Sequence, residues 1–256
     1  MTVTGHGTDG TRELRALRDE RSSVRLGAAL AIGSTPDPRF VGPLVERCAV
    51  EPEFLVRDML TWALTRHPVA DTLPPLLREV RSERPQARSQ ALHTLSKVGD
   101  PRAWHAITRA LLTDGDDEVA RTAWRAAVVL VPEGEEAALA AVLVTQLGRG
   151  GQETQLSLSR ALVGLGSAMV SALDTAKRSA APDVRAHALA TERLRHDPDT
   201  GFAFALEEAK RVVALGGAGA EAGTTSSDGS GDSGSFGGSG SSDRSGGSRD
   251  FDGEGP

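Results

Sequence analysis

Apolar residues recur along the chain with the spacing that places them on one face of an α-helix. They lie one residue before and three residues after a recurring arginine, and in most copies seven residues after it as well. Offsets of −1, +3 and +7 fall on a single helical stripe, so each copy predicts a helix with one buried face. The arginines that mark these copies are Arg25, Arg57, Arg88, Arg121 and Arg185.

The arginine-marked segments repeat at a nearly constant interval. Successive arginines are 32, 31 and 33 residues apart, and the last interval of 64 is twice that period. The copy expected between Arg121 and Arg185 is present in degraded form. Gln155 stands in place of the arginine, and Leu158 and Leu162 lie at offsets +3 and +7. In the last copy Glu192 breaks the apolar stripe, as expected for a terminal repeat. A period of this length indicates stacked helical hairpins.

A further set of helices is predicted between these segments. Asp37-Pro38, Asp100-Pro101 and Asp197-Pro198 each match an N-cap residue followed by proline at the first helical position. The chain therefore predicts an all-α solenoid of about six hairpins, with the arginine-bearing helix second in each and Phe202 to Leu215 as a capping helix. Helices are expected near residues 12–20, 22–34, 38–50, 53–66, 71–82, 86–98, 101–113, 117–131, 135–147, 153–165, 168–178, 183–195 and 200–215.

The composition divides the chain into three regions. Residues 1–11 are expected to be a disordered N-terminus, residues 12–215 the solenoid, and residues 216–256 a disordered tail rich in Gly, Ser and Asp. The tail holds seven acidic and two basic residues, so it carries most of the formal net charge of −6. Phe236 and Phe251 are its only large apolar residues, and they are either docking points for a partner or incidental.

Short sequence units recur within the predicted helices. They include Val24-Arg25, Val56-Arg57, Asp116 to Arg121 and Pro182 to Arg185, together with Ala87 to Leu92 and Gly99 to Ala103. These units and their period resemble HEAT repeats, in particular the short bacterial type called HEAT-like or lyase-type repeats, including those of high-GC actinobacteria. The resemblance covers roughly residues 12–215 and implies an α-superhelix that mediates interactions. A fold of this kind does not settle function.

Charge and composition limit the functional classes to which this protein can be assigned. The solenoid region is close to neutral, whereas proteins that bind nucleic acid through its phosphates usually carry a strongly basic surface, so nucleic acid is not the expected partner. Cys48 is the only cysteine, which excludes an internal disulfide and a cysteine-rich zinc site. Residues 1–10 lack the apolar core of a signal peptide, and the longest apolar runs, 126–131 and 137–144, are shorter than the roughly 20 residues that span a bilayer. We therefore expect a cytoplasmic protein without a membrane segment.

The repeated arginines have two possible roles. They could line a surface for acidic ligands. Alternatively, as the resemblance to HEAT repeats implies, each could bind an acidic or carbonyl group at a neighbouring turn and so form a ladder that fixes the stacking. We expect the ladder, which would comprise Arg25, Arg57, Arg88, Arg121 and Arg185.

Offsets +1, +5 and +9 of the arginine-bearing helices lie away from the apolar stripe, and the HEAT resemblance places them toward the concave face. Aromatic residues and arginine dominate the energy of many interfaces, so we predict a partner-binding patch at these offsets. Trp62 could instead pack against a neighbouring hairpin, and Trp124, at offset +3, is expected in the core. The predicted patch comprises Asp58, Trp62, Arg66, Ser89, His93, Lys97, Thr122 and Arg160.

The sequence offers little support for catalysis or metal binding. The histidines are isolated and none is followed by glutamate, unlike the ligand pairs of iron hydroxylases built on HEAT repeats. No His-x-x-x-His pair with a neighbouring carboxylate is present. The glycine-rich segment 148–151 is followed by Gln152 and Glu153 rather than the lysine and serine or threonine of a P-loop. We expect no metal, no cofactor and no catalytic residues.

Three functional hypotheses follow. The first is a non-catalytic scaffold or adaptor that holds a partner protein or peptide on the concave face. The second is an enzyme on a HEAT-like scaffold, of lyase or DNA-glycosylase type, for which Asp58, Trp62 and Arg66 superficially resemble a glycosylase groove although the neutral solenoid argues against duplex binding. The third is a regulatory subunit that binds a short peptide or a transcription factor. Charged terminal helices favour a monomer.

Overall fold

The computed structural model describes residues 6–199 and 201–222, with side chains from residue 10 to residue 215. All regular secondary structure in these ranges is helical, as predicted. The predicted N-terminal region before residue 6 and the predicted tail after residue 222 lie outside the described residues, and so do Phe236 and Phe251.

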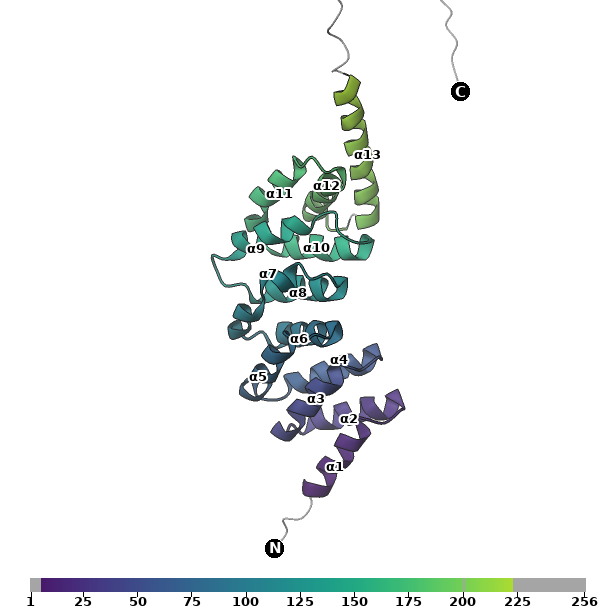
Figure 1. Ribbon diagram of the computed structural model, residues 1–256, viewed down its shortest axis with the longest axis vertical. Coiled ribbons are helices and arrows are strands. Elements are labelled where there is room, and N and C mark those ends of the chain that lie inside the picture. The colour runs from purple at the N-terminus through teal and green to yellow at the C-terminus, as the bar shows by residue number, and fades with distance from the viewer. Residues whose placement is uncertain (1–5, 200, 223–256) are drawn as a thin grey trace, which may run out of the picture.

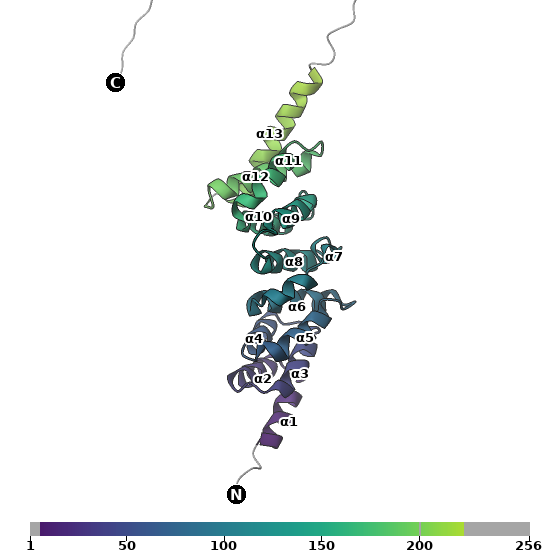
Figure 2. The ribbon, with the colours of Figure 1, turned by 90° about the vertical axis from the view of Figure 1, so that its left-hand side faces the viewer.

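The described helices stack as six hairpins in two layers and end in a closing helix, so the predicted α-solenoid is confirmed. Figure 1 shows the hairpins following one another along the long axis, and Figure 2 separates the two layers. The first-helix layer contains α1 (His6–Ala16), α3 (Val41–Cys48), α5 (Val69–Glu79), α7 (Arg109–Leu112), α9 (Glu136–Leu143) and α11 (Val170–Lys177). The second-helix layer contains α2 (Ser22–Ser34), α4 (Phe54–Thr65), α6 (Pro85–Val98), α8 (Asp117–Leu130), α10 (Gln152–Gly164) and α12 (Pro182–His196), followed by the closing helix α13 (Phe202–Ala222).

Several first helices are preceded or followed by a 3-10 segment, which the sequence pattern did not indicate. These segments are η1 (Pro38–Phe40), η2 (Pro101–Ala106), η3 (Val144–Gln146) and η4 (Gly166–Met169). Asp37 and Asp100 cap η1 and η2 as predicted, because each carboxylate accepts a hydrogen bond from the backbone N–H two residues later. The predicted N-cap at Asp197 is wrong, since this residue ends α12 and α13 begins only at Phe202.

Both predicted boundaries of the solenoid differ from the observed helices. Helix α1 begins at His6, within the predicted disordered N-terminus, and α13 continues to Ala222, beyond the predicted end at Leu215. The extension, residues 216–222, contains three alanines, the residue with the highest helix propensity, and three glycines, which lower that propensity.

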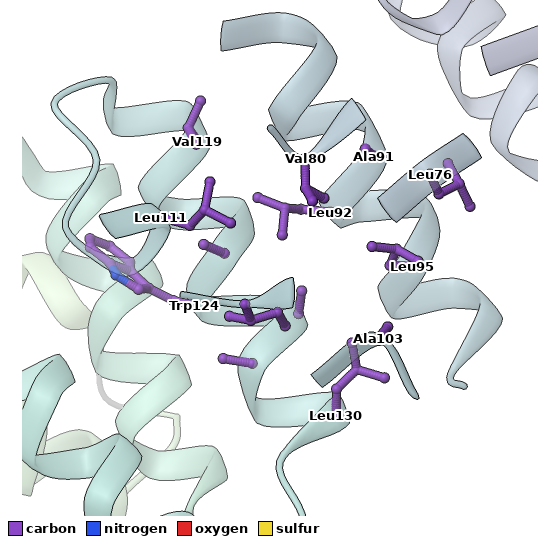
Figure 3. Packing of buried hydrophobic residues seen from close by; sticks show 14 of the residues in the cluster. Leu76, Val80, Ala91, Leu92, Leu95, Ala103, Leu111, Val119, Trp124 and Leu130 are labelled. Atoms are coloured by element: carbon purple, nitrogen blue, oxygen red, sulfur yellow. The ribbon is translucent and has the colours of Figure 1, made fainter. Parts of the chain in front are cut away.

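The core lies between the two layers, where the predicted apolar stripes meet. Leu60, Leu64 and Leu95 are fully buried, and so is Trp124. The Trp124 indole also donates a hydrogen bond of 2.8 Å to the backbone oxygen of Leu112, which satisfies its buried N–H. Figure 3 shows side chains from α5, α6, α7 and α8 meeting in this space.

The recurring arginines bind the turn that joins the two helices of their own hairpin. In four of the five, Nη1 donates to the backbone oxygens six and five residues earlier; for Arg25 these belong to Asp19 (2.9 Å) and Glu20 (2.7 Å). Arg57, Arg88 and Arg185 repeat the pattern. Arg121 is the exception among the five, because its guanidinium faces Glu153 at 3.4 Å and Glu118 at 3.7 Å.

Some of these arginines also reach an acidic residue of the following hairpin. Arg25 pairs with Glu51 at 2.7 Å, and Arg88 pairs with Asp114 at 3.0 Å. One guanidinium therefore connects two successive turns. In the degraded repeat the Gln155 amide takes the same place and donates to the backbone oxygen of Gly150 at 3.1 Å.

Glu51 connects the first three hairpins. Its carboxylate is fully buried and accepts hydrogen bonds of 2.7 Å from Arg25 and from Arg47. Its backbone oxygen accepts from Arg57 and Gln86. Burial raises the pKa of the Glu51 carboxyl, but the hydrogen bonds from the two arginines outweigh burial and lower this pKa to about 2. The carboxylate is therefore charged throughout the physiological pH range.

Adjacent second helices are joined by pairs of buried hydroxyl groups. The Oγ atoms of Thr61 and Thr94 lie 3.4 Å apart, and those of Ser159 and Thr191 lie 2.8 Å apart. Small side chains at these positions let neighbouring helices approach closely, and the hydrogen bonds satisfy the hydroxyls that burial removes from water.

His187 ties the C-terminal hairpins together. Its ring is fully buried, and Nδ1 accepts a hydrogen bond of 3.0 Å from the backbone N–H of Gly148. Nδ1 is therefore unprotonated, and Nε2 donates toward the backbone oxygen of Gln155 or the hydroxyl of Ser159, both 3.0 Å away. Burial lowers the pKa of His187 to about 4, so the ring is neutral at pH 7.

Helix α13 covers the end of the stack with an apolar face of its own. Phe202 and Leu206 are buried against Ala186 and Ala190 of α12. The ring of Phe202 also meets the ring of His187 edge-on at a centroid distance of 5.9 Å. This packing covers the terminal core, as a capping helix is expected to do.

None of the described helices has, by itself, the length and apolar composition to cross a bilayer. Helix α10 and the η4–α11 segment together meet both criteria, but they are bent by 119° relative to each other.

Replacing Glu51 by glutamine is expected to lower the free energy of unfolding by about 3–5 kcal/mol, because Arg25 would remain buried without a charged partner. Urea denaturation monitored by circular dichroism measures this loss. The control is Arg102→Gln, which removes an exposed ion pair with Asp100 and is expected to cost much less, because solvent screens exposed pairs. Equal losses in the two variants would contradict the role assigned to Glu51.

Lowering the pH from 7 to 5 is expected to reduce the stability by about 2 kcal/mol through His187. The unfolded chain binds a proton near pH 6.5, whereas the folded chain binds it only near pH 4, so protons favour unfolding in this window. Urea denaturation at several pH values measures the slope, which His187→Gln should flatten. His196→Gln, at the exposed end of the same helix, should leave the slope unchanged.

Candidate functional site

A groove with a volume of about 1000 Å³ crosses the second-helix layer over α4, α6 and α8. Each of the three helices contributes side chains to it. The lining residues are Phe54, Arg57, Asp58, Thr61, Trp62, Thr65, Pro85, Gln86, Ser89, Gln90, His93, Lys97, Asp116, Glu118, Thr122 and Arg125.

Six of the eight residues of the predicted patch line this groove. They are Asp58, Trp62, Ser89, His93, Lys97 and Thr122. The other two do not: Arg66 is the C-cap residue of α4, and Arg160 is exposed on α10. Because the groove is lined by α4, α6 and α8, a position on α10 lies outside it.

Two of the predicted patch residues form the floor of the groove and are not exposed. Ser89 and Thr122 are 3% and 2% exposed, and their hydroxyl oxygens lie 3.2 Å apart. Offset +1 on α6 and α8 faces the neighbouring helix, so these hydroxyls bond each other across the helix contact. They shape the groove and are not free to bind a ligand.

Trp62 occupies one wall of the groove and remains 37% exposed. Its six-membered ring lies against Gly33 of α2, where an added Cβ would overlap with the ring and come within 2.9 Å of the Cα of Ala63. Trp62 thus both packs against the preceding hairpin and lines the groove, so the two alternatives weighed from the sequence coexist.

The charged residues of the groove are balanced in sign. Arg57, Lys97 and Arg125 are matched in number by acidic residues at positions 58, 116 and 118. Burial lowers the pKa of His93, with Lys97 and Arg125 adding to the effect. The neutral form of the His93 ring is therefore favoured.

Some lining residues were missed because the predicted stripe began one helical turn too late. Phe54, Pro85 and Glu118 lie at offset −3, on the same helical face as +1 and +5. Phe54 is 62% exposed, and the guanidinium of Arg57 lies 5.9 Å from the centre of its ring. Extending the stripe toward the helix starts would have identified all three residues.

The described residues offer one hydroxyl–imidazole pair that resembles a catalytic dyad. Ser159 Oγ lies 3.0 Å from Nε2 of His187, but both side chains are fully buried. The other ring nitrogen accepts a hydrogen bond, so the imidazole lacks the oriented partner that would assist proton transfer. Within the described part of the chain, no three His, Cys, Asp or Glu side chains cluster as metal ligands do.

The helices that form the groove match a known repeat family. Residues 44–128, from within α3 to near the end of α8, match the family model of HEAT repeats. No curated protein sequence matches the chain. HEAT repeats commonly act as protein-interaction scaffolds.

Replacing Gly33 by alanine is expected to destabilise the protein by about 1–3 kcal/mol, since the new methyl group must displace Trp62 or the backbone of α4. The matched control is Gly27→Ala in the same helix, where an added Cβ meets no atom within 4 Å. That change is expected to stabilise by about 0.5–1 kcal/mol through helix propensity. Urea denaturation measures both, and a neutral Gly33→Ala would show that Trp62 is not held by this contact.

Proposed function

We propose that this HEAT-repeat domain protein is a non-catalytic scaffold that binds a segment of a partner protein in the groove over α4, α6 and α8. The observation that carries the proposal is the groove itself, which presents exposed aromatic side chains beside unengaged charges. Trp62 and Phe54 are solvent-accessible there, and Asp58 and Lys97 form no ion pair or side-chain hydrogen bond with any described residue.

The size and composition of the groove suit a peptide segment. A volume of about 1000 Å³ lies at the upper end of the range for small-molecule sites, roughly 300–1,000 Å³. Fully enclosed small-molecule sites are mostly apolar, whereas this lining combines two aromatic residues with many polar side chains. Aromatic anchors with polar surroundings are typical of protein interfaces.

The balance of charge favours protein over nucleic acid as the partner. Binding to a phosphate backbone needs an excess of lysine and arginine, and the groove has equal numbers of acidic and basic residues. A protein segment of mixed charge satisfies both signs. A scaffold and a regulatory subunit differ only in which protein supplies this segment.

The proposed scaffold has no catalytic groups of its own. The residues that line the groove include one histidine, His93, and no cysteine, and no described hydroxyl is hydrogen-bonded to that histidine's ring. The Ser159–His187 pair is buried away from the groove in the C-terminal hairpins. These features favour binding over the lyase or glycosylase alternatives.

The test begins with cross-linking from inside the groove. A photo-reactive amino acid in place of Gln90, introduced into the full chain, is used to capture proteins in native lysate, and mass spectrometry identifies the cross-linked segment. A synthetic peptide of that segment is then titrated against the purified full chain by fluorescence anisotropy. Trp62→Ala/Lys97→Ala is expected to weaken this binding at least tenfold, as loss of interface anchors does.

The control variant, Val129→Ala/Arg160→Ala, removes two exposed side chains of the same layer that do not line the groove. It should bind the peptide as the unmodified chain does. Unchanged binding by the groove variant, or equal losses in both variants, would show that the groove is not the recognition site.

A further inference from the structure

Helix α4 presents a stripe of two aromatic residues with a carboxylate between them. Phe54, Asp58 and Trp62 are spaced four residues apart, so they lie on one face of the helix at successive turns. All three line the groove. Phe54 is 62% exposed and Trp62 is 37% exposed, so both rings are accessible to a bound molecule.

Asp58 is the carboxylate of the groove that remains available. Asp116 caps α8 by accepting hydrogen bonds from the backbone N–H groups of Glu118 and Val119. The Glu118 carboxylate lies 3.3 Å from the Thr122 hydroxyl and 3.4 Å from Arg125. Asp58 has no hydrogen bond or ion pair with any described residue through its side chain. A charge in a groove without a partner is a recognition element for the opposite charge.

The two rings add an affinity for cations of a particular kind. An aromatic face attracts a guanidinium or ammonium group, most strongly when the ring is tryptophan. Phe54 already receives such a group within the chain, since the Arg57 guanidinium lies 5.9 Å from the centre of its ring. Trp62 is held in place by Gly33, so its exposed part is fixed before any ligand binds.

Arginine fits this arrangement better than lysine. Its planar guanidinium forms two parallel hydrogen bonds to a carboxylate and stacks on aromatic rings at the same time. We propose that Phe54, Asp58 and Trp62 form a subsite for an arginine side chain of the partner segment. This inference rests on the proposed function and specifies one residue type that the partner supplies.

The experiment uses N-acetyl-arginine amide as the probe and the full ¹⁵N-labelled chain as the receptor. The chain has three tryptophans, and Trp62→Phe identifies the indole N–H signal of Trp62 in the NMR spectrum. We expect this signal to shift saturably with a Kd in the millimolar range. The neutral isostere N-acetyl-citrulline amide is expected to bind at least fivefold more weakly, because it lacks the charge but keeps the shape.

Two variants distinguish binding at the subsite from a general effect of the protein's charge. Asp58→Asn should weaken binding of the arginine probe at least fivefold. Glu83→Gln makes the same change of charge at an exposed residue that does not line the groove, and it should leave the Kd unchanged. Both variants should keep the circular dichroism spectrum and unfolding midpoint of the unmodified chain.

Three results would overturn the inference: no saturable shift, equal binding of the citrulline probe, or unchanged binding by Asp58→Asn. Tighter binding by a chain that ends at Ala222 would show that Arg244 or Arg249 competes for the subsite, which would reject a partner as its occupant. The first three results do not test whether a partner occupies the groove. The cross-linking experiment answers that question separately, so the two proposals can fail independently.

Discussion

The hairpins of this protein depend on one recurring interaction, the hydrogen bonds from an arginine of four of the six second helices to the turn that precedes it. Backbone carbonyl groups of a turn lie outside the hydrogen-bond pattern of both helices and need another donor. In hairpins such as that of Arg25, the guanidinium satisfies two carbonyls of the turn while its stem lies on the second helix. The interaction therefore fixes the two helices of a hairpin relative to each other. Where the arginine also reaches an acid of the next turn, as Arg88 does with Asp114, it fixes the next hairpin as well.

Regular stacking has a direct consequence for the surface of the second-helix layer. When hairpins repeat in the same orientation, equivalent offsets on successive helices line up: offsets −3 and +1 of α4, α6 and α8 line the groove, together with offset +5 of α4 and α6. Buried hydroxyl pairs such as Thr61 and Thr94 keep neighbouring second helices close enough for this alignment. The groove is thus a product of the repeat and not of any single hairpin. Its chemistry comes from the residues that break the repeat pattern, such as Trp62 and Phe54.

The sequence was sufficient to predict the fold but only part of the site. The apolar stripe of each helix and the repeat interval can both be read from residue spacing. The hairpins, the core position of Trp124 and the capping helix therefore follow from spacing alone. The orientation of offset +1 depends on how closely adjacent helices approach, which is why Ser89 and Thr122 are buried against each other instead of exposed. The isolated histidine His187 could not be placed from sequence, because its partners Gly148 and Gln155 lie 39 and 32 residues away. Contacts at that distance along the chain are set by the stacking itself.

The groove ends at α8 because the repeat changes there. Arg121 faces Glu153 and Glu118 instead of its own turn, and the next copy replaces the arginine by Gln155, whose amide makes a single bond to the turn. In this region the stack relies on other contacts, with His187 joining the loop at Gly148 to α10 and α12. The range that matches the HEAT-repeat family, residues 44–128, contains the three helices that line the groove. The central hairpins therefore carry the aligned offsets that line the groove, whereas the hairpins on their C-terminal side are joined by the buried hydrogen bonds of His187.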